Sequence, residues 1–333
     1  MIDAPGRPVA TSIEALLADA TERTPMKTGD SKSGAPFERV LIDGEPHVVK
    51  YLHVDDDWIQ RVTGDLGCLP LEVWRSGILD RLPPCIDHAV VGMAAGLGRG
   101  GWGAALLMRD VGPWLVPEGD DPVPPEQHAR FMDHMAALHA AFWGWDDDRR
   151  LMPRAHRYLY FGDTNMALEA ARPEPDAIPL IVVEGWRRFA ETSRLVAPLL
   201  ALREAPWPLI EALAALPQTL LHGDWKMGNL GSHPDGRTIL LDWAVTGRGV
   251  ATSELAWYLA LNRARLPEPK EASIERYRVA LEAHGVSTDR WWETAVDLAL
   301  LGSLVQFGWE KALGDRDELA WWEDAAEAGL RRL

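Results

Sequence analysis

Hydrophobic residues in the first third of the chain occur in short runs that are separated by polar turns. Residues 37–42 and 46–52 are rich in β-branched and aromatic side chains, and the Asp-Gly pair between them is a hairpin signal. Two further strands are predicted over residues 88–93 and 104–108. The glycine-rich loop between them precedes a strand and not a helix, so we assign it to a hairpin and not to a dinucleotide-binding turn. This part of the chain is expected to form an antiparallel sheet.

Short helices are predicted around these strands. Ser12 precedes an apolar pattern of helical period and is suited to cap a helix. The acidic run at residues 55–57 is expected at a helix N-terminus, where carboxylates complement the helix dipole. Residues 71–79 have a second helical pattern. Residues 1–11 are rich in proline, glycine and small side chains and are expected to be loosely attached.

Helical periodicity dominates the rest of the chain. Over residues 125–143, large apolar side chains recur at positions i, i+4, i+7 and i+11, which places them on one face of a helix. Further helices are predicted over residues 184–200, from Thr252 or Ser253 to residue 262, and throughout residues 270–333. Residues 158–179 are irregular, and we expect substrate contacts within residues 151–200.

A chain of 333 residues is longer than one ordinary hydrophobic core supports. Because the strand pattern ends near residue 108 and helices follow it, we expect an α+β fold with two lobes. The first, residues 1–112, would be a small antiparallel sheet with a helix. The second, residues 113–333, would be larger and mainly helical.

The candidate chemistry lies in one stretch of the second lobe. His222, Asp224 and Asn229 form the pattern His-x-Asp-x4-Asn, and Asp242 follows the apolar run 238–241 after a polar turn. A loop, a tight turn and a short strand would bring the carboxylates of Asp224 and Asp242 and the amide of Asn229 into one site. One acid can then take the proton of a substrate hydroxyl, while Asn229 and Asp242 hold Mg²⁺ on the phosphates of a nucleotide. The motif is short, and a solvated loop before an ordinary strand is the alternative.

This stretch resembles the catalytic loop and metal-binding turn of the aminoglycoside phosphotransferase-like family, the small-molecule branch of the protein-kinase-like fold. The resemblance implies a bilobal kinase-like fold, with ATP and Mg²⁺ as cofactors. It also implies that the catalytic residues are Asp224, Lys226, Asn229 and Asp242. Lys226 departs from the family, which usually has His there, but resembles the protein-kinase loop, where it would neutralise the transferring group. The family usually has Asp at the position of Glu254, where it braces the catalytic loop.

By the same resemblance, Lys50 matches the strand lysine that contacts the α- and β-phosphates of the nucleotide. It interrupts an apolar strand, and an edge-strand lysine that faces solvent is the alternative. Glu72 would be the helix carboxylate that pairs with Lys50 and orients it. An exposed helix glutamate, or a pair between Glu72 and Arg75, is the alternative.

Two loops would contact the rest of the nucleotide. Residues 28–34 are rich in glycine and serine, and their last two residues, Ser33 and Gly34, are suited to approach phosphates, although a plain surface turn has the same composition. The connection between the lobes would offer backbone groups of Met108, Arg109 and Val111 to the edge of the adenine ring.

Composition narrows the class of partner. The formal net charge is −16, which argues against nucleic acid as a ligand, because phosphate backbones require a basic surface. It would suit a cationic substrate, although acidic surfaces also serve solubility. Two cysteines are too few for a disulfide framework. Neither a signal peptide nor a membrane span is recognised, so a cytoplasmic protein is expected; the oligomeric state is open.

These observations predict an ATP- and Mg²⁺-dependent phosphotransferase that acts on the hydroxyl of a small molecule, an amino sugar or an aminoglycoside. Tryptophans and glutamates of residues 270–333 could form a wall for a cation, or they could belong to ordinary amphipathic helices. The alternatives are a kinase of another small alcohol (choline-like, homoserine or macrolide) and a silent nucleotide-binding protein of the same fold. A metal-dependent hydrolase that uses His222, Asp224 and Asp242 is a third, but it leaves Lys50 unexplained.

Overall fold

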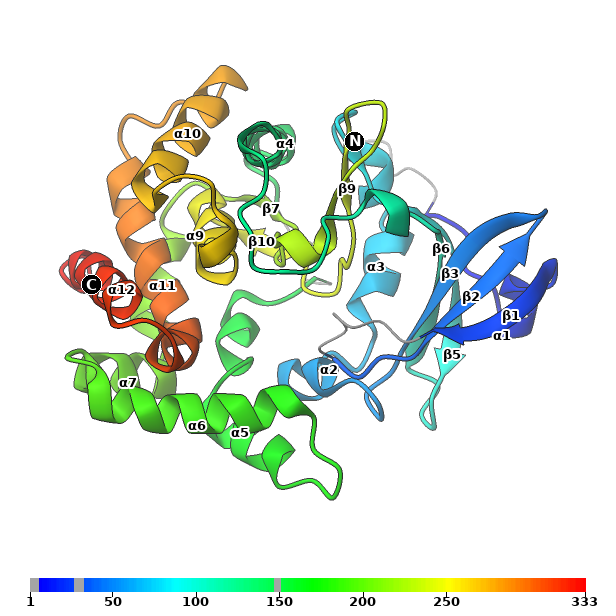
Figure 1. The fold of residues 1–333 in the computed structure, drawn as a ribbon, viewed down its shortest axis with the longest axis horizontal. Coiled ribbons are helices and arrows are strands. Elements are labelled where there is room, and N and C mark those ends of the chain that lie inside the picture. Colours follow the sequence, from blue (N-terminus) through cyan, green and yellow to red (C-terminus); the bar gives the residue numbers. More distant parts are fainter. Residues whose placement is uncertain (1–5, 27–32, 147–150) are drawn as a thin grey trace. The chain divides into compact units, whose positions relative to one another are not determined.

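The computed structural model describes residues 6–26, 33–146 and 151–333. The chain forms two compact units (Figure 1). The first unit comprises Met1–Asp120 and Asp224–Thr246, and the second comprises Asp121–Gly223 and Gly247–Leu333. The segment that carries the candidate catalytic residues therefore packs with the N-terminal part of the chain.

The first unit contains a five-stranded antiparallel sheet with the order β1-β2-β3-β6-β5, drawn in blue to cyan in Figure 1. Its strands are β1 (Ala20–Met26), β2 (Phe37–Ile42), β3 (Glu45–Leu52), β5 (Val90–Leu97) and β6 (Gly103–Arg109). The predicted hairpin is confirmed, and Asp43 and Gly44 at its turn both have positive φ angles, of 52° and 79°. The edge strand β1 was not predicted, because it is mostly exposed and its polar sequence lacks apolar alternation.

One face of this sheet is covered by the N-terminal segment. The core there contains Val40, Val49 and Leu107, and helix α1 (Ile13–Leu16) packs against it, capped by Ser12 as predicted. The expectation that residues 1–11 are loosely attached is wrong for the part that is described. Ala10 forms a β-bridge to Ala94, and the Pro8 carbonyl accepts a hydrogen bond of 2.8 Å from the Trp74 indole.

Two short helices follow β3. Helix α2 (Trp58–Thr63) begins at Asp57, whose carboxylate accepts hydrogen bonds from two backbone N–H groups of the first turn. Helix α3 (Leu69–Arg75) is shorter than the predicted 71–79. Gly77, with a φ of 68°, separates it from the 3₁₀ turn η1 (Ile78–Arg81).

A three-stranded sheet of order β4-β9-β8 completes the first unit. It consists of β4 (Ile86–Asp87), β8 (Leu230–Ser232) and β9 (Thr238–Leu240), which confirms the strand predicted before Asp242. The backbone of Leu115 crosses Gly231 of β8 so closely that a Cβ on Gly231 would lie 2.7 Å from the Trp114 carbonyl oxygen. The 3₁₀ turns η2 (Gly112–Trp114) and η4 (Met227–Asn229) also belong to this unit.

In the described residues of the second unit, the elements are helices apart from one two-stranded ribbon, β7 (Thr219–Leu221) with β10 (Gly247–Gly249). Its central helix, α11, is buried over most of its length and packs against α6, α9 and α12 (Figure 1). The bounds are α4 (Pro125–Ala141), η3 (Arg154–Leu159), α5 (Asp163–Ala170), α6 (Ala177–Thr192), α7 (Val196–Glu204), α8 (Trp207–Ala214), α9 (Ala251–Leu261), η5 (Arg263–Arg265), α10 (Lys270–Ala283), α11 (Trp292–Leu313) and α12 (Arg316–Leu330). No helix in the described part of the chain is long and apolar enough to span a membrane.

Two predicted helices of this unit differ from the observed ones. The predicted helix 184–200 is interrupted at Ser193, because Glu323 of α12 accepts hydrogen bonds from the Ser193 hydroxyl and from the backbone N–H of Arg194. The predicted serine or threonine cap of α9 is also wrong. Val250 occupies that position, and the Thr252 hydroxyl donates to the Ala295 carbonyl instead.

The tryptophans and acids of the C-terminal helices are largely engaged with the protein's own cations. Lys270 lies 4.7 Å from the ring centroid of Trp321, whose indole N–H donates to Glu271. Lys311 lies 5.4 Å from the ring centroid of the fully buried Trp322. These pairs favour the amphipathic-helix interpretation over a wall that receives a cationic substrate.

We expect Gly231→Ala to lower the free energy of unfolding by about 1–3 kcal/mol, because its methyl group would be forced against the Trp114 carbonyl. Gly67→Ala is the matched control, since nothing lies within 4 Å of a Cβ there. Denaturant unfolding of both variants measures the difference. A Gly231→Ala variant as stable as the Gly67→Ala variant would contradict the close crossing.

Candidate active site

Asp242 lies two residues after the end of the β9 strand and has a left-handed backbone conformation. Its φ angle is 64°, in the left-handed region that residues other than glycine, asparagine and aspartate rarely adopt. The N–H of the preceding Leu241 donates a 2.9 Å hydrogen bond to the Asn229 carbonyl, which ties this turn to η4. Non-glycine residues in this conformation cluster at functional sites.

Lys50 reaches Asp242 from the central strand β3. Its Nζ lies 2.9 Å from Asp242 Oδ2, and the residue is only 8% exposed, so the alternative of an edge-strand lysine that faces solvent is wrong. Burial alone would lower the pKa of Lys50. The charges of Asp242 and Asp57 outweigh burial and raise that pKa, so Lys50 is a cation at neutral pH.

The predicted pair between Lys50 and Glu72 is not formed. Glu72 lies 2.9 Å from Arg75 on the next turn of α3, and Lys50 pairs with Asp242. The helix carboxylate whose charge acts on Lys50 is Asp57, the cap of α2. Sequence reasoning recognised the acidic run 55–57 as a helix start but missed this second role, because an N-cap and a buried ion-pair partner have the same sequence signature.

Asp57 is buried, and it is held by the loop predicted to contact phosphates. Burial raises its pKa, and the positive charge of Lys50 and a hydrogen bond from the Ser33 hydroxyl offset part of that effect. Gly34 has a φ of 83°, a conformation that favours glycine. The rest of the predicted phosphate loop, residues 28–32, lies outside the described residues.

Asp224, Lys226 and Asn229 form one hydrogen-bonded group in the same unit. The Asn229 side-chain amide donates to the backbone carbonyl of Asp224 at 2.9 Å and to its carboxylate Oδ2 at 2.8 Å. Lys226 Nζ lies 3.0 Å from the same Oδ2. Because the Asn229 amide nitrogen faces Asp224, its Oδ1 oxygen is available to accept a ligand.

Met108 and Arg109 end strand β6, and Val111 follows them. The N–H of Arg109 donates to the Ala89 carbonyl at 3.0 Å, so it is already used by the sheet. Met108 likewise pairs across both neighbouring strands. Among the described residues, no hydrogen-bond partner is found for the N–H of Val111, so of the three predicted adenine contacts it is the one whose N–H is not already used.

In the second unit, the residues that lead into Asp224 are braced by a buried carboxylate. Glu254 of α9 accepts hydrogen bonds from the backbone N–H groups of His222, at 3.0 Å, and Gly223. His139 Nε2 lies 2.9 Å from Glu254 and its Nδ1 2.5 Å from the Tyr277 hydroxyl. Burial alone would raise the pKa of Glu254; the hydrogen bond and Coulomb interaction with His139 outweigh it, and the pKa lies below its ordinary value of 4.5. Glutamate therefore serves here as the brace that the family usually builds from aspartate.

Comparison with known families decides the class of protein. The chain matches the phosphotransferase enzyme family over residues 81–287, which is more than half of its length. The chain belongs to this family. The family match confirms the predicted kinase-like α+β fold and the predicted enzyme class, a small-molecule kinase. No match to this phosphotransferase was found among the curated proteins.

Several solved structures resemble this phosphotransferase at low sequence identity. A choline kinase from Streptococcus pneumoniae is 12% identical, with a TM-score of 0.49 over 96% of this chain and 98% of that one. An aminoglycoside phosphotransferase from Alicyclobacillus acidocaldarius is 16% identical, with a TM-score of 0.42 over 94% and 90%. An ethanolamine kinase from Plasmodium vivax is 9% identical, with a TM-score of 0.46 over 92% and 81%.

Glu254→Gln should destabilise the phosphotransferase by about 3–5 kcal/mol at pH 7, because it breaks a fully buried pair, removes the anionic acceptor of both backbone N–H groups and leaves one of them facing an amide nitrogen. The folded-state pKa of Glu254 is lowered, so its stabilisation is present above the unfolded pKa near 4.5 and is lost as the pH falls through the folded pKa. The measurement is the free energy of unfolding of both proteins from pH 7 to pH 3.

The difference between wild type and Glu254→Gln should therefore shrink as the pH falls. Glu275→Gln, an exposed change on α10, is the control and should stay within about 0.5 kcal/mol of wild type. A constant difference across the pH range would show that Glu254 acts through packing and not through its charge.

Proposed function

We propose that this chain transfers the γ-phosphoryl group of ATP, with Mg²⁺, to a hydroxyl of a small-molecule acceptor. One observation supports the proposal most strongly. The first unit contains both the Lys50–Asp242 ion pair and the Asp224–Asn229 hydrogen bonds. The backbone hydrogen bond from Leu241 to Asn229 links them. Phosphoryl transfer needs little covalent chemistry from the protein, and positioning and charge supply most of the catalysis.

Asp224 is proposed as the group that orients the acceptor hydroxyl and accepts its proton. Its contacts with Lys226 and Asn229 hold its carboxylate in one orientation. Lys226 also supplies a positive charge beside the reacting oxygen, where negative charge spreads over the transferring group. As the hydroxyl oxygen forms its bond to phosphorus, the bond to the departing ADP oxygen breaks.

Mg²⁺ would be held by Asp242 and by Asn229 Oδ1. Both are hard oxygen ligands, and Mg²⁺ in such sites takes one or two protein ligands and completes its shell with phosphates and water. When bound, the metal would neutralise charge on the β- and γ-phosphates. The orientation of the Asn229 amide, with its nitrogen toward Asp224, fits this assignment because it leaves the oxygen for the metal.

The nucleotide would be bound by residues of the first unit. We assign the phosphates to Lys50, Ser33 and Gly34, with Asp57 in place of Glu72 as the helix carboxylate acting on the lysine. The adenine edge is assigned to the segment Met108–Val111, chiefly through Val111. Residues 1–112 would then bind ATP, and residues 113–333 would carry the catalytic loop and the acceptor site.

Acceptor identity is the least constrained part of the proposal. The net charge of −16 still favours an amino sugar or an aminoglycoside, because an acidic protein attracts a cationic acceptor. The tryptophans and glutamates of residues 270–333 no longer support such an acceptor, because those side chains pair with Lys270 and Lys311. Choline-like alcohols, homoserine and macrolides are alternative acceptors. A silent nucleotide-binding protein is disfavoured because every residue type that transfer requires is present.

Asp224→Asn should reduce phosphoryl transfer about a hundredfold or more while largely sparing ATP binding, because the carboxylate acts on the acceptor. The measurement is ADP release over a panel of hydroxyl compounds, with ATP affinity followed separately. Asp235→Asn, at an exposed turn of the same segment, should retain activity. Turnover near the wild-type rate in Asp224→Asn would refute the assignment.

Asp242→Ala should abolish the dependence of ATP binding on Mg²⁺, since it removes one of the two proposed metal ligands. Calorimetry of ATP binding with Mg²⁺ and with a chelator measures this dependence in both proteins. Wild type should bind more tightly with Mg²⁺, and the variant should bind equally in both conditions. An unchanged gain from Mg²⁺ in the variant would make Asp242 a structural partner of Lys50 only.

A further inference from the structure

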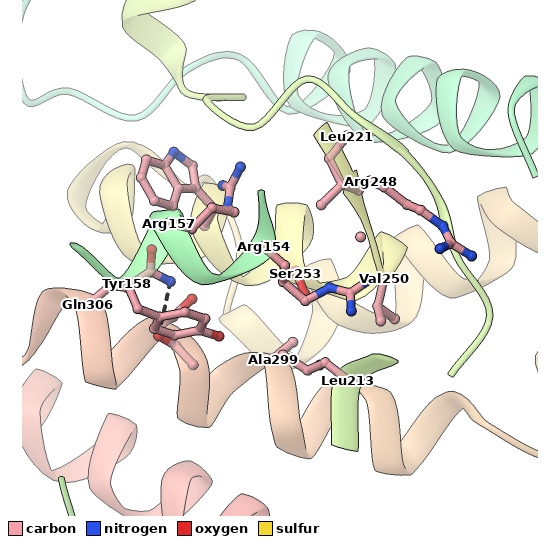
Figure 2. A pocket seen from close by; sticks show the side chains of 14 residues that line it. Arg154, Arg157, Tyr158, Leu213, Leu221, Arg248, Val250, Ser253, Ala299 and Gln306 are labelled. Atoms are coloured by element: carbon pink, nitrogen blue, oxygen red, sulfur yellow. Dashed lines mark hydrogen bonds between the residues drawn. The ribbon is translucent and has the colours of Figure 1, made fainter. Parts of the chain in front are cut away.

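A pocket lined entirely by the second unit has a charge opposite to that of the protein as a whole. Its volume is about 30 Å³. Figure 2 shows the side chains that line it, contributed by η3, β10, α9 and α11 among other elements. Three arginines are among them, Arg154, Arg157 and Arg248, and no aspartate or glutamate is. In a chain with a net charge of −16, this composition indicates a site for a negative group.

Two of the arginines carry buried N–H groups that lack partners. The Nε atoms of Arg154 and Arg248 are both buried, and neither has a hydrogen-bond partner among the described residues. Elsewhere, Arg154 donates through Nη2 to Gln218, and Arg248 Nη1 lies 3.3 Å from Asp146, whose side chain is 85% exposed. Buried donors without partners are rare in folded proteins, and a bound ion or ligand is one of their common explanations.

The electrostatics of the pocket also favour an anion. Burial, followed by repulsion from Arg248, lowers the pKa of Arg154. Burial raises the pKa of Tyr158 to about 12, so its hydroxyl keeps its proton and can donate a hydrogen bond. A negative ligand would relieve the repulsion between the arginines and accept from these donors.

We propose that this pocket binds a carboxylate of the phosphotransferase's acceptor, which makes the acceptor a hydroxy acid and not a purely cationic amine. This inference rests on the proposed function. The volume of about 30 Å³ exceeds the roughly 10–15 Å³ that one water molecule requires, so the pocket can admit a small polar group. The arginine fork is also the side chain best matched to carboxylate geometry.

A second feature of the pocket specifies what lies beside the carboxylate. Gln306 of α11 is 8% exposed and lines the pocket, and its Oε1 has no hydrogen-bond partner among the described residues. The Gln306 amide nitrogen donates to the Gly302 carbonyl at 3.1 Å, the dashed line in Figure 2, which fixes Oε1 as the free end. Since an oxygen accepts but cannot donate, the acceptor should carry an N–H or O–H group close to its carboxylate.

The chain itself links the pocket to the proposed catalytic acid. Leu221 lines the pocket, and Arg157 Nη2 donates a 2.8 Å hydrogen bond to the carbonyl of Gly223. Gly223 directly precedes Asp224 in the sequence. Arg157 therefore connects the pocket to the residue that precedes the proposed catalytic acid in the chain.

The binding test uses three alcohols with the same four-carbon chain and a hydroxyl beside the variable group: 2,4-dihydroxybutanoate, 2,4-dihydroxybutanamide and 4-amino-1,3-butanediol. They present an anion, a neutral amide and a cation, and ionic strength is matched with sodium chloride. The carboxylate should raise the melting temperature of the wild-type protein more than the other two do. Arg154→Gln and Arg248→Gln should each weaken its binding about tenfold to a hundredfold, because each removes a charge-assisted hydrogen bond.

Arg188→Gln removes the same charge at an exposed position of α6 and should leave carboxylate binding unchanged. Arg248→Gln keeps the test decisive if the more enclosed Arg154→Gln fails to fold. Equal binding of the carboxylate and the amide, or equal loss in Arg188→Gln and Arg248→Gln, would overturn the proposal.

Turnover with Mg·ATP separates this inference from the proposed function. Transfer to the carboxylate acceptor, with a raised KM and a nearly unchanged kcat in Arg248→Gln, would support both. Transfer to the amine or the amide in preference to the carboxylate would overturn the anion site and leave the kinase assignment intact. Carboxylate binding that depends on Arg248, without ATP consumption for any hydroxyl compound, would leave the anion site standing and refute the proposed function.

Discussion

The ion pair between Lys50 and Asp242 is the interaction on which the arrangement of the proposed site residues in the first unit depends. A lysine in the middle of a sheet is tolerated only if a carboxylate meets its charge, because burial otherwise disfavours the ammonium. Asp242 supplies that carboxylate from a left-handed conformation two residues after β9. The same turn is bonded to the Asn229 backbone, so one electrostatic requirement places the proposed metal ligands and, through Asn229, the proposed catalytic acid.

The catalytic loop is anchored independently at its start. Glu254 takes the N–H groups of His222 and Gly223, and its charge is compensated by His139 in a fully buried network. Such a network is costly if any member is lost, and it defines a single loop geometry when it is complete. The residues before Asp224 are thus held by the buried carboxylate of Glu254, and Asn229 after it is held by the backbone of the turn that carries Asp242.

The parts that could be predicted from the sequence are those with local signatures. The hairpin at residues 43–44, the strand before Asp242 and the spacing of the catalytic motif all follow from short-range rules. The exchange of Glu72 for Asp57 could not be foreseen, because it depends on which helix end the fold brings to Lys50. The arginine pocket could not be predicted for the same reason. Its residues are distant in sequence, and they come together only through the packing of η3, β10 and α11.

The first unit is assembled from two pieces of chain that are separated by residues 121–223. During synthesis, its last piece leaves the ribosome only after that whole intervening segment, on the order of 5–20 s later at typical elongation rates. Until then, β4 lacks its hydrogen-bonded neighbour β9, and Lys50 lacks the carboxylate that neutralises it. The nascent N-terminal portion therefore exposes the unpaired strand β4 and the Lys50 side chain, which is buried in the folded protein. Chaperone binding would protect this state from aggregation.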